Sequence, residues 1–492
     1  MNSAAQGFEE LTIESLHDGF RAGTITAYEV TQWYLDRIAD SRLNAVVTTN
    51  PRALDEAAEL DRRWAAGGPV GPLHGVPVLI KDQGETAGIP TSFGSELFAD
   101  YIPKRDCTVV AQLRTAGAVI LAKTTMCDFA AGWFSSSSRT GHTSNAYATE
   151  RDSGGSSAGT AAGVAANLGL VGVGEDTGGS IRIPASFNNL FGLRVTTGLI
   201  SRTGFSPLVH FQDTPGPMAR TVGDLALLLE TMVSYDPADP YTVVAATTPR
   251  LPYLSAVTDP EAGSGLRVGV LESGFGSDAD PRCAPVNTVV RPAIAELARL
   301  GATVVPDLHI DNLSAEIAET SVYVKQSRSD ITGFLADRGG PVASFDEIYE
   351  RKAFHPENDL FHGIMGGPVD VAGDAEYLRL RLNQEHFRRK VLGLFADNAL
   401  DVLVYPTVQV IPPTHTELAE GLYSALTFPT NTVIGSQSGL PALTMPVGFT
   451  TDNLPVGLEA LGSPFCETAL LRLAASWEAA VNPRKAPTLA HS

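Results

Sequence analysis

The stretch RDSGGSSAGTAAGVAANLGLVGVGEDTGGSIRIP, residues 151–184, places two glycine–serine clusters on either side of an apolar run. Glycine–serine runs are typical of flexible linkers. The Ala-, Gly- and Val-rich spacer between these two clusters instead has the composition of a buried segment. Its end, LGLVGVGED, predicts a buried strand that runs directly into the second glycine-rich turn. A turn of this kind at a strand end is typical of an α/β fold that presents a functional side chain.

Two earlier runs, VPVLIKD (76–82) and AVILAKT (118–124), have the same continuous apolar character. They predict strands that are buried on both faces, and DCTVVAQLRTAG (106–117) predicts a helix between them. We therefore expect a single-domain α/β/α architecture with a mixed central sheet. The remaining expected elements are helices within 9–40, 50–67, 285–300, 374–395 and 466–480, strands at 266–272, 302–308 and 401–408, a hairpin at 439–462 and a long surface connection over 235–264.

The composition indicates a globular protein. The chain has 492 residues, 43% of them hydrophobic and 18% charged, which is enough apolar material for a large core. Its 35 Lys and Arg residues stand against 55 Asp and Glu residues, for a formal net charge of −20. This balance argues against nucleic acid or an anionic membrane as a main partner.

Targeting signals are not visible in the sequence. The N-terminal residues lack the basic and apolar regions of a signal peptide, and we find no apolar run of membrane-spanning length. The four cysteines, Cys107, Cys127, Cys283 and Cys466, form no CxxC pair, so we expect free thiols in a reducing compartment. The expected location is the cytoplasm.

Ser180 is the candidate nucleophile, because it lies in the turn after the predicted strand. The backbone N–H groups of Thr177, Gly178, Gly179 and Ser180 can converge on a developing oxyanion. An alternative is that 155–159 (GSSAG) forms the nucleophile elbow of an α/β-hydrolase, but no apolar strand precedes that motif. A phosphate-binding P-loop is less consistent still, because neither cluster ends in Gly-Lys-Ser/Thr.

A serine nucleophile needs a base, and no histidine lies in a motif near either cluster. Lys81 ends the apolar run 76–80. On spacing alone, a lysine that caps a strand end in water is the more conservative interpretation. If it were buried, desolvation would lower the pKa of its amine toward neutrality, and the lysine could then accept a proton.

Together, the motifs HGVPVLIKD, GGSSAG, GEDTGGSIRIP, TPGPMART and SGLPALTMPVGF…LPVGLEALG resemble the amidase signature family of serine hydrolases. The resemblance extends over nearly the whole chain and is weakest between about 230 and 400. It implies a triad in which Ser180 is the nucleophile, Ser156 is a bridging serine on a cis peptide and Lys81 is the base. It also implies one domain, 1–492, with a catalytic core at about 70–230 and 400–480 and a variable pocket region at about 235–400.

The implied activity is hydrolysis of a carbon–nitrogen bond through an acyl-enzyme, without metal or organic cofactor, on a small amide-type substrate with water. Anilides, esters and carbamates fit the same relay. Candidate substrate-binding residues are Trp133, Phe134, Ser135 and Gln212, although both aromatic residues could instead belong to the core. A monomer or homodimer is expected.

Departures from the common family pattern include Ala158, Glu175 and Arg194, none of which is a triad residue. They make the chain more similar to free-standing peptide-amide and aryl-amide hydrolases than to the glutaminase subunit of the tRNA-dependent amidotransferase. That subunit, releasing ammonia from glutamine within a complex, remains one alternative. A non-catalytic binding protein of the same fold is another. Asp176 and Arg182, which flank the nucleophile turn, could be a bracing ion pair or two ordinary surface charges.

Overall fold

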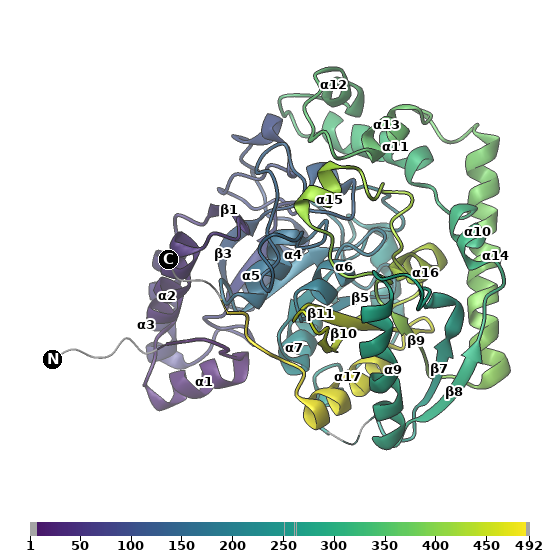
Figure 1. Ribbon diagram of the computed structural model, residues 1–492. Coiled ribbons are helices and arrows are strands. Elements are labelled where there is room, and N and C mark those ends of the chain that lie inside the picture. The colour runs from purple at the N-terminus through teal and green to yellow at the C-terminus, as the bar shows by residue number, and fades with distance from the viewer. Residues whose placement is uncertain (1–6, 250, 260, 262, 489–492) are drawn as a thin grey trace.

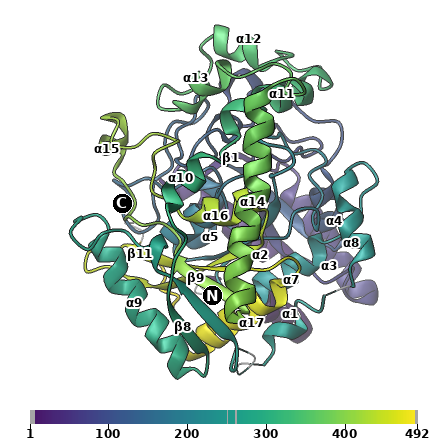
Figure 2. The same ribbon diagram turned by 90° about the vertical axis from the view of Figure 1, so that its right-hand side faces the viewer.

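The computed structural model describes residues 7–249, 251–259, 261 and 263–488 and is built on one mixed sheet flanked by helices (Figures 1 and 2). Its eleven strands lie in the order β1-β3-β2-β4-β6-β5-β10-β11-β9-β7-β8. The strands are β1 Val46–Thr49, β2 Pro77–Lys81, β3 Val119–Thr124, β4 Val171–Glu175, β5 Phe191–Arg194, β6 Pro215–Ala219, β7 Arg267–Leu271, β8 Thr303–Leu308, β9 Val402–Pro406, β10 Ala442–Phe449 and β11 Pro455–Gly462. The expected mixed-sheet α/β class is confirmed.

The expected helices are present, and further helices lie between them. They are α1 Ile13–Ala22, α2 Ala27–Asp40, α3 Ala53–Gly67, α4 Thr108–Thr115, α5 Ala158–Ala165, α6 Arg182–Phe187, α7 Val222–Met232, α8 Val243–Thr247, α9 Ala284–Arg299, α10 Leu313–Ala318, α11 Tyr323–Ala336, α12 Phe345–Glu350, α13 Leu360–Met365, α14 Ala375–Asn398, α15 His415–Ala419, α16 Thr432–Ser438 and α17 Glu467–Val481. Thr26 caps α2, and its side chain and that of Glu29 form a reciprocal capping box.

Strands β2, β3 and β4 form the parallel part of the sheet that carries the candidate site. β2 lies between the other two, and every residue of all three strands is buried. Helix α5 packs on β2 and β4, and the α5 positions next to the sheet are small. At Gly159, for instance, a Cβ would lie 2.1 Å from the carbonyl oxygen of Ala45. The Ala- and Gly-rich spacer is therefore a helix pressed closely against the sheet.

A group of helices between β8 and β9 forms a separate layer. Helices α11, α12 and α13 pack on one another at the top of Figure 1. Their apolar side chains form a second buried cluster that includes Phe93, Phe129 and Trp133 from the earlier part of the chain. This helical layer thus reaches the loops that surround the candidate site.

The described residues of segment 235–264 form the expected long surface connection, and they contain short helical turns. Within its described residues these are α8 and two 3-10 turns, Pro240–Thr242 and Ser255–Val257. Asp239 caps the first turn, since its side chain accepts a hydrogen bond from the backbone N–H of Tyr241. Pro and Asp therefore mark helix starts here, because proline suits the first helical position.

Candidate active site

Lys81, the last residue of β2, is completely buried. Its Nζ donates a hydrogen bond to Ser156 Oγ at 2.7 Å and another to the backbone carbonyl of Glu175 at 3.1 Å. The interpretation of Lys81 as a strand-end lysine in water is therefore wrong. Its amine points at the serine that the family resemblance assigns as the bridge.

Ser156 follows a cis peptide bond, Gly155–Ser156. The backbone N–H of Gly155 donates to the carbonyl of Trp133 at 2.7 Å. A Cβ on Gly155 would lie 2.1 Å from the carbonyl oxygen of Phe134, so only glycine allows this approach. The first glycine–serine cluster is thereby pressed against the loop that holds the candidate substrate-binding residues.

Ser157 connects the two clusters and has no free hydroxyl. Its backbone N–H donates to the carbonyl of Ser180 at 3.1 Å, and its Oγ lies 3.3 Å from both the N and the O of Glu175. The residues before it form only isolated bridges rather than a strand. The α/β-hydrolase elbow, which requires a strand before the serine, is therefore wrong for this chain.

Ser180 lies in the turn between β4 and α6 and is 2% exposed. Gly179 has φ +151°, and a Cβ there would meet Thr432 Oγ1 at 2.0 Å. A Cβ on Gly178 would lie 2.2 Å from the Trp133 ring and 2.3 Å from the Tyr323 hydroxyl. Both glycines are therefore required for side chains from distant segments to close over the turn.

The backbone N–H groups of this turn are available to a ligand. Throughout the described residues, no hydrogen-bond acceptor takes the N–H of Thr177, Gly178, Gly179 or Ser180. The Thr177 side chain donates instead to Asp213 at 2.6 Å, and its carbonyl accepts from Gln212 at 2.7 Å. Hydrogen bonds to the Thr177 side chain and carbonyl fix the turn. Its backbone N–H groups therefore remain free to bind an oxyanion.

Asp176 is the centre of a buried network of charges. Its carboxylate accepts from Arg182 and from Arg194, each at 3.1 Å, and Arg182 also pairs with Glu459. All four side chains are completely buried. Burial alone would raise the pKa of Asp176, but the two guanidinium groups outweigh it and lower that pKa to about 2. Asp176 and Arg182 are therefore a bracing ion pair rather than surface charges.

Glu175 and Lys81 form a different kind of pair. Their charged atoms are 3.6 Å apart and both side chains are completely buried. Burial lowers the pKa of Lys81, against the opposing attraction of Glu175. Burial, with the nearby Asp213 carboxylate, raises the pKa of Glu175 to about 8. Both shifts favour the uncharged forms, so the lysine is disposed to accept a proton.

The four candidate substrate-binding residues take different positions. Trp133 lies directly against Gly178, and its indole N–H donates to the carbonyl of Ala425. Phe134 is half-buried and packs edge-on against Phe428 with ring centroids 4.9 Å apart.

Ser135 and Gln212 are both engaged within the protein. The Ser135 hydroxyl donates to Asp152 at 2.6 Å. Gln212 supports the turn through Thr177, while its amide oxygen accepts from Gln384 at 3.3 Å. It also lines a cavity of about 410 Å³ that none of Ser180, Ser156 and Lys81 borders.

Sequence reasoning did not find Tyr323 or Thr432. Tyr323, in α11, packs against Gly178 and lies 3.2 Å from Gln212 through its hydroxyl. Thr432, at the start of α16, packs against Gly179. No motif marks either residue, because each reaches the turn from a separate helix. The one signal in the sequence is the pair Gly178 and Gly179, because glycine is required where another side chain approaches the backbone closely.

A model of the Amidase family matches residues 29–471, most of the chain. The chain belongs to the amidase family. Among curated relatives, the glutamyl-tRNA(Gln) amidotransferase subunits A of Alkaliphilus metalliredigens and Azotobacter vinelandii are 34% and 36% identical over 486 and 488 residues. These alignments cover 95% of both chains in the first case, and 96% of this chain and 98% of the relative in the second.

Solved structures give the same assignment. The native peptide amidase of Stenotrophomonas maltophilia superposes with a TM-score of 0.83 at 31% identity, over 98% of this chain and 99% of that one. A bacterial aryl acylamidase of the amidase signature family superposes with a TM-score of 0.80 over 96% of both chains, and at 23% identity it speaks for the fold alone. The protein is accordingly an amidase that hydrolyses carbon–nitrogen bonds of amides.

Proposed function

We propose that this amidase is a serine hydrolase in which Ser180 is the nucleophile, Ser156 the bridging proton carrier and Lys81 the general base. The observation that carries the proposal is the 2.7 Å hydrogen bond between Lys81 Nζ and Ser156 Oγ, in surroundings where both side chains are completely buried. The hydrogen bond between Ser157 and the carbonyl of Ser180 keeps the two serine clusters in contact.

In the proposed acylation step, neutral Lys81 takes the proton of Ser156 while Ser156 takes that of Ser180. The Ser180 oxygen attacks the amide carbonyl carbon, and the carbonyl oxygen becomes negative. Free N–H groups of residues 177–180 donate to this oxygen. Stabilisation of the oxyanion in this way is usually the largest single contribution to the catalysis of acyl transfer. The proton returns through Ser156 to the leaving nitrogen, the C–N bond breaks and the amine departs.

Deacylation runs through the same groups. A water molecule gives its proton to the Ser156–Lys81 pair and attacks the ester that Ser180 now carries. The tetrahedral intermediate collapses with cleavage of the C–O bond to Ser180, which regains its proton. The carboxylic acid leaves and the free enzyme is restored.

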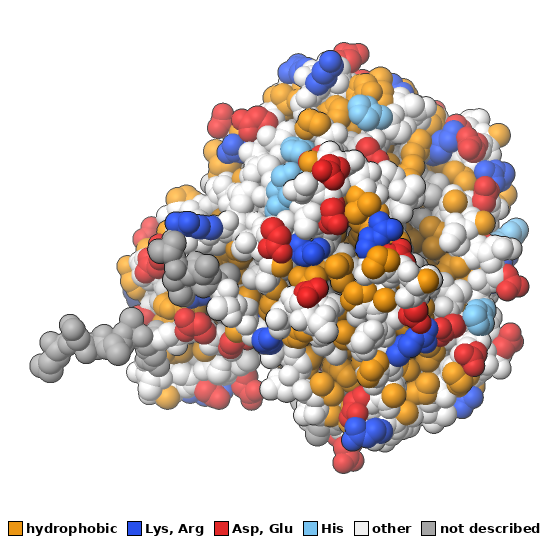
Figure 3. All heavy atoms as spheres, in the orientation of Figure 1, with side chains coloured by type: hydrophobic (Ala, Val, Ile, Leu, Met, Phe, Trp, Pro, Cys, Tyr) orange, Lys and Arg blue, Asp and Glu red, His pale blue; other side chains and the backbone are white. Residues whose placement is uncertain are grey.

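For the substrate we propose a neutral aryl or alkyl amide, with anilides and carbamates in the same class. Trp133 lies against the turn and Phe134 belongs to an adjoining aromatic group with Phe428, which suits a flat apolar substituent. The net charge of −20 disfavours anionic substrates at long range. On the face in Figure 3, acidic and basic side chains are interspersed, so no strong local field of one sign is visible there.

We further propose that the whole chain works as one amidase domain, with a catalytic core at about 70–230 and 400–480 and a pocket region at about 235–400. The contact of Tyr323 with the nucleophile turn supports this division. Cytoplasmic residence is supported by the four free cysteines. Of the helices in the described residues, none combines the length and the apolar character that crossing a membrane requires. A monomer or homodimer is proposed.

The deciding experiment compares kcat/KM for an acetanilide-type substrate with kcat/KM for free glutamine on the isolated chain. Faster hydrolysis of the anilide is expected. A panel of peptide amides, aryl amides and carbamates then ranks the acyl and amine groups. Faster hydrolysis of glutamine would overturn the proposed substrate class while leaving the triad intact.

The second candidate function is that of an amidotransferase A subunit. Two curated relatives with this name are 34% and 36% identical to the chain over nearly its full length. This function predicts ammonia release from glutamine and transfer within a complex. Co-purification of the untagged chain from its native source distinguishes the two, because the proposed free-standing amidase should elute without a stoichiometric partner.

A non-catalytic role is tested separately, by labelling with a serine-reactive phosphonate. A protein with an intact relay should be labelled at one serine.

A further inference from the structure

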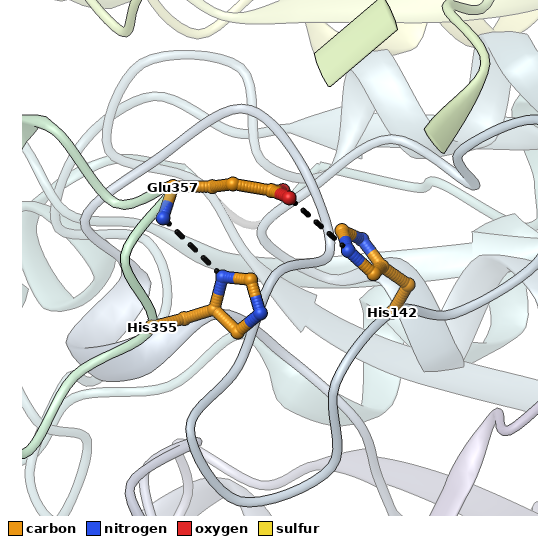
Figure 4. A group of neighbouring side chains, drawn as sticks. All are labelled: His142, His355 and Glu357. Carbon is orange, nitrogen blue, oxygen red and sulfur yellow. Dashed lines mark hydrogen bonds and ion pairs between the residues drawn. The ribbon is translucent and has the colours of Figure 1, made fainter. Parts of the chain in front are cut away.

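Three histidines and two carboxylates come together outside the candidate triad. Figure 4 shows His142, His355 and Glu357 pointing toward one another from two separate loops. Glu357 Oε1 lies 3.4 Å from His142 Nε2, and ligand atoms of all three residues lie within 4.8 Å of one another. A second group, His142, Asp152 and His415, meets the same 4.8 Å limit.

This donor set matches the preferences of zinc and similar divalent transition metals. Imidazole and carboxylate ligands bind such ions at about 2.0–2.2 Å, so neighbouring ligand atoms in a tetrahedral site lie about 3.3–3.5 Å apart. The 3.4 Å separation of Glu357 Oε1 and His142 Nε2 already has this value. A ligand atom of His355 lies within 4.8 Å of both.

The surroundings orient the ligands in the way that known metal sites require. Ser136 Oγ donates to Glu357 Oε2 at 2.7 Å, which leaves Oε1 for the cluster. His142 Nδ1 faces the buried carboxylate of Asp152 at 4.0 Å, on the side of the ring opposite Nε2. Asp152 is itself fixed by the Ser135 hydroxyl.

His415 adds an independent observation. Its Nε2 is buried and has no hydrogen-bond partner among the described residues. The ring of His415 lies 4.7 Å from that of His142, centroid to centroid. A buried nitrogen without a partner is costly, so this imidazole is open to a further interaction.

The cluster is accessible enough to take up a metal ion from solution. The side chains of His142 and Glu357 are 26% and 20% exposed, and histidine side chains reach the surface in Figure 3 beside the position that α15 takes in Figure 1.

We propose that His142, His355 and Glu357 bind one zinc-like divalent metal ion that ties two loops together, with His415 beside His142. The ligands come from the loop before α5 and the loop between α12 and α13. Sequence spacing could not indicate this site, because His142 lies more than 200 positions before the other two ligands. The expectation that the reaction needs no metal is unaffected, since none of these residues belongs to the triad.

The bound metal would affect the loop that carries the candidate substrate-binding residues Trp133, Phe134 and Ser135. Ser136 is bonded to Glu357 through its hydroxyl, and its carbonyl accepts from Asn358 at 3.1 Å. Trp133, three residues earlier, lies against Gly178. Fixing the cluster would therefore hold the loop that carries Trp133 in place. The expected consequence is a lower KM in the presence of metal with little change in kcat.

The test uses tag-free, full-length protein stripped with EDTA and dialysed into chelator-free buffer. Titration with zinc chloride by calorimetry should give one site per chain, and saturating zinc should raise the Tm by at least about 2 °C. Cobalt(II) should give the visible absorption of a tetrahedral site. Hydrolysis of an anilide should show unchanged kcat and a raised KM after stripping.

Glu357→Gln and His355→Ala should each abolish the one-site isotherm and the cobalt spectrum. His386→Ala, at an exposed histidine of α14, is the matched control and should retain both. Should the variants not fold, anomalous scattering at the zinc edge from wild-type crystals still decides, because the peak must lie between His142 and Glu357. Absence of binding, or binding that survives both substitutions, would overturn the site and leave the proposed amidase function untouched.

Discussion

Glu175 and Asp176 are neighbours at the end of β4, yet their surroundings are opposite. Asp176 is bonded by two guanidinium groups, and its pKa is lowered to about 2. Glu175 faces one amine, that of Lys81 at 3.6 Å, and its Oε1 accepts long hydrogen bonds from Thr214 and Thr177. Its Oε2 has no hydrogen-bond partner among the described residues, and its pKa is raised to about 8. Successive residues of a strand point to opposite faces, and here each face has its own electrostatics.

The difference assigns a structural role to the surroundings of Asp176 and a role in proton transfer to the surroundings of Glu175. On the Asp176 side two guanidinium groups hold the carboxylate ionised, and it also accepts the N–H of Ile181, next to Ser180. This side fixes the shape of the turn. On the Glu175 side the pairing is incomplete and the uncharged forms are favoured, so a proton can move. The predictions below test this division.

The largest effect is expected at Ser180. Ser180→Ala should reduce amide hydrolysis by at least about 10⁴-fold, because the relay loses its nucleophile. The Asp176 network does not involve this hydroxyl, so the Tm should stay within about 2 °C of wild type. Steady-state kinetics and a thermal melt measure the two quantities.

A phosphonate adduct mapped by mass spectrometry should fall on Ser180, and Ser180→Ala should abolish it. Ser157→Ala is the matched control and should still be labelled. An adduct on Ser157 in the wild-type protein would contradict the assignment.

Lys81→Met should lower kcat/KM by about 10²–10⁴-fold, the usual contribution of a general base. It should cost little stability, because the Glu175 carboxyl left behind can remain protonated at neutral pH. The pH profile of the residual activity should also lose the rise through neutrality that we expect of the wild-type enzyme. Wild-type turnover in this variant would exclude Lys81 as the base.

Arg182→Met should give the opposite pattern. It leaves Asp176 and Glu459 as buried carboxylates with one partner fewer, and breaking such a pair costs about 3–5 kcal/mol. Urea denaturation measures the loss. A variant as stable as Lys81→Met would show that the two sides of the strand end do not differ as described.

Much of the sheet could be predicted from the sequence, because β2, β3 and β4 are buried on both faces and appear as continuous apolar runs. The candidate triad came from long motifs in the right order rather than from spacing. Spacing alone favoured a solvated Lys81, since a strand-end lysine looks the same whether or not other loops cover it.

What covers the site could not be predicted. Tyr323 approaches from α11, and the Gln212 side chain turns back onto Thr177. The histidine cluster is assembled from three loops. Such contacts depend on how distant segments pack, and a periodic pattern reports only which face of one element is buried.

The finest test of the division is Glu175→Gln, which removes an ionisable carboxyl and keeps the shape. Where Glu175 is ionised, its attraction raises the pKa of Lys81. The substitution should therefore let Lys81 lose its proton more easily at pH values above about 8, where Glu175 ionises, and the alkaline part of the rising limb of kcat/KM should move toward acid. Turnover at the optimum should remain within about tenfold of wild type, because Glu175 takes no part in the relay.

Stability gives a second readout of the same substitution. The pKa of Glu175 is raised by folding from 4.5 to about 8, so the stability that its protonated form contributes is fully present below pH 4.5 and is lost as the pH rises through about 8. Glutamine cannot ionise. Glu175→Gln should therefore be more stable than wild type at pH 9 and nearly equal to it at pH 5.

Asp176→Asn is the matched control at the neighbouring position. Its lowered pKa contributes stability that is present above pH 3.8 and lost as the pH falls through about 2. The substitution should therefore destabilise the protein at both pH 5 and pH 9, because Arg182 and Arg194 lose their shared anion. Denaturant melts at the two pH values compare the variants, and equal behaviour of Glu175→Gln and Asp176→Asn would remove the distinction between the two faces of the strand.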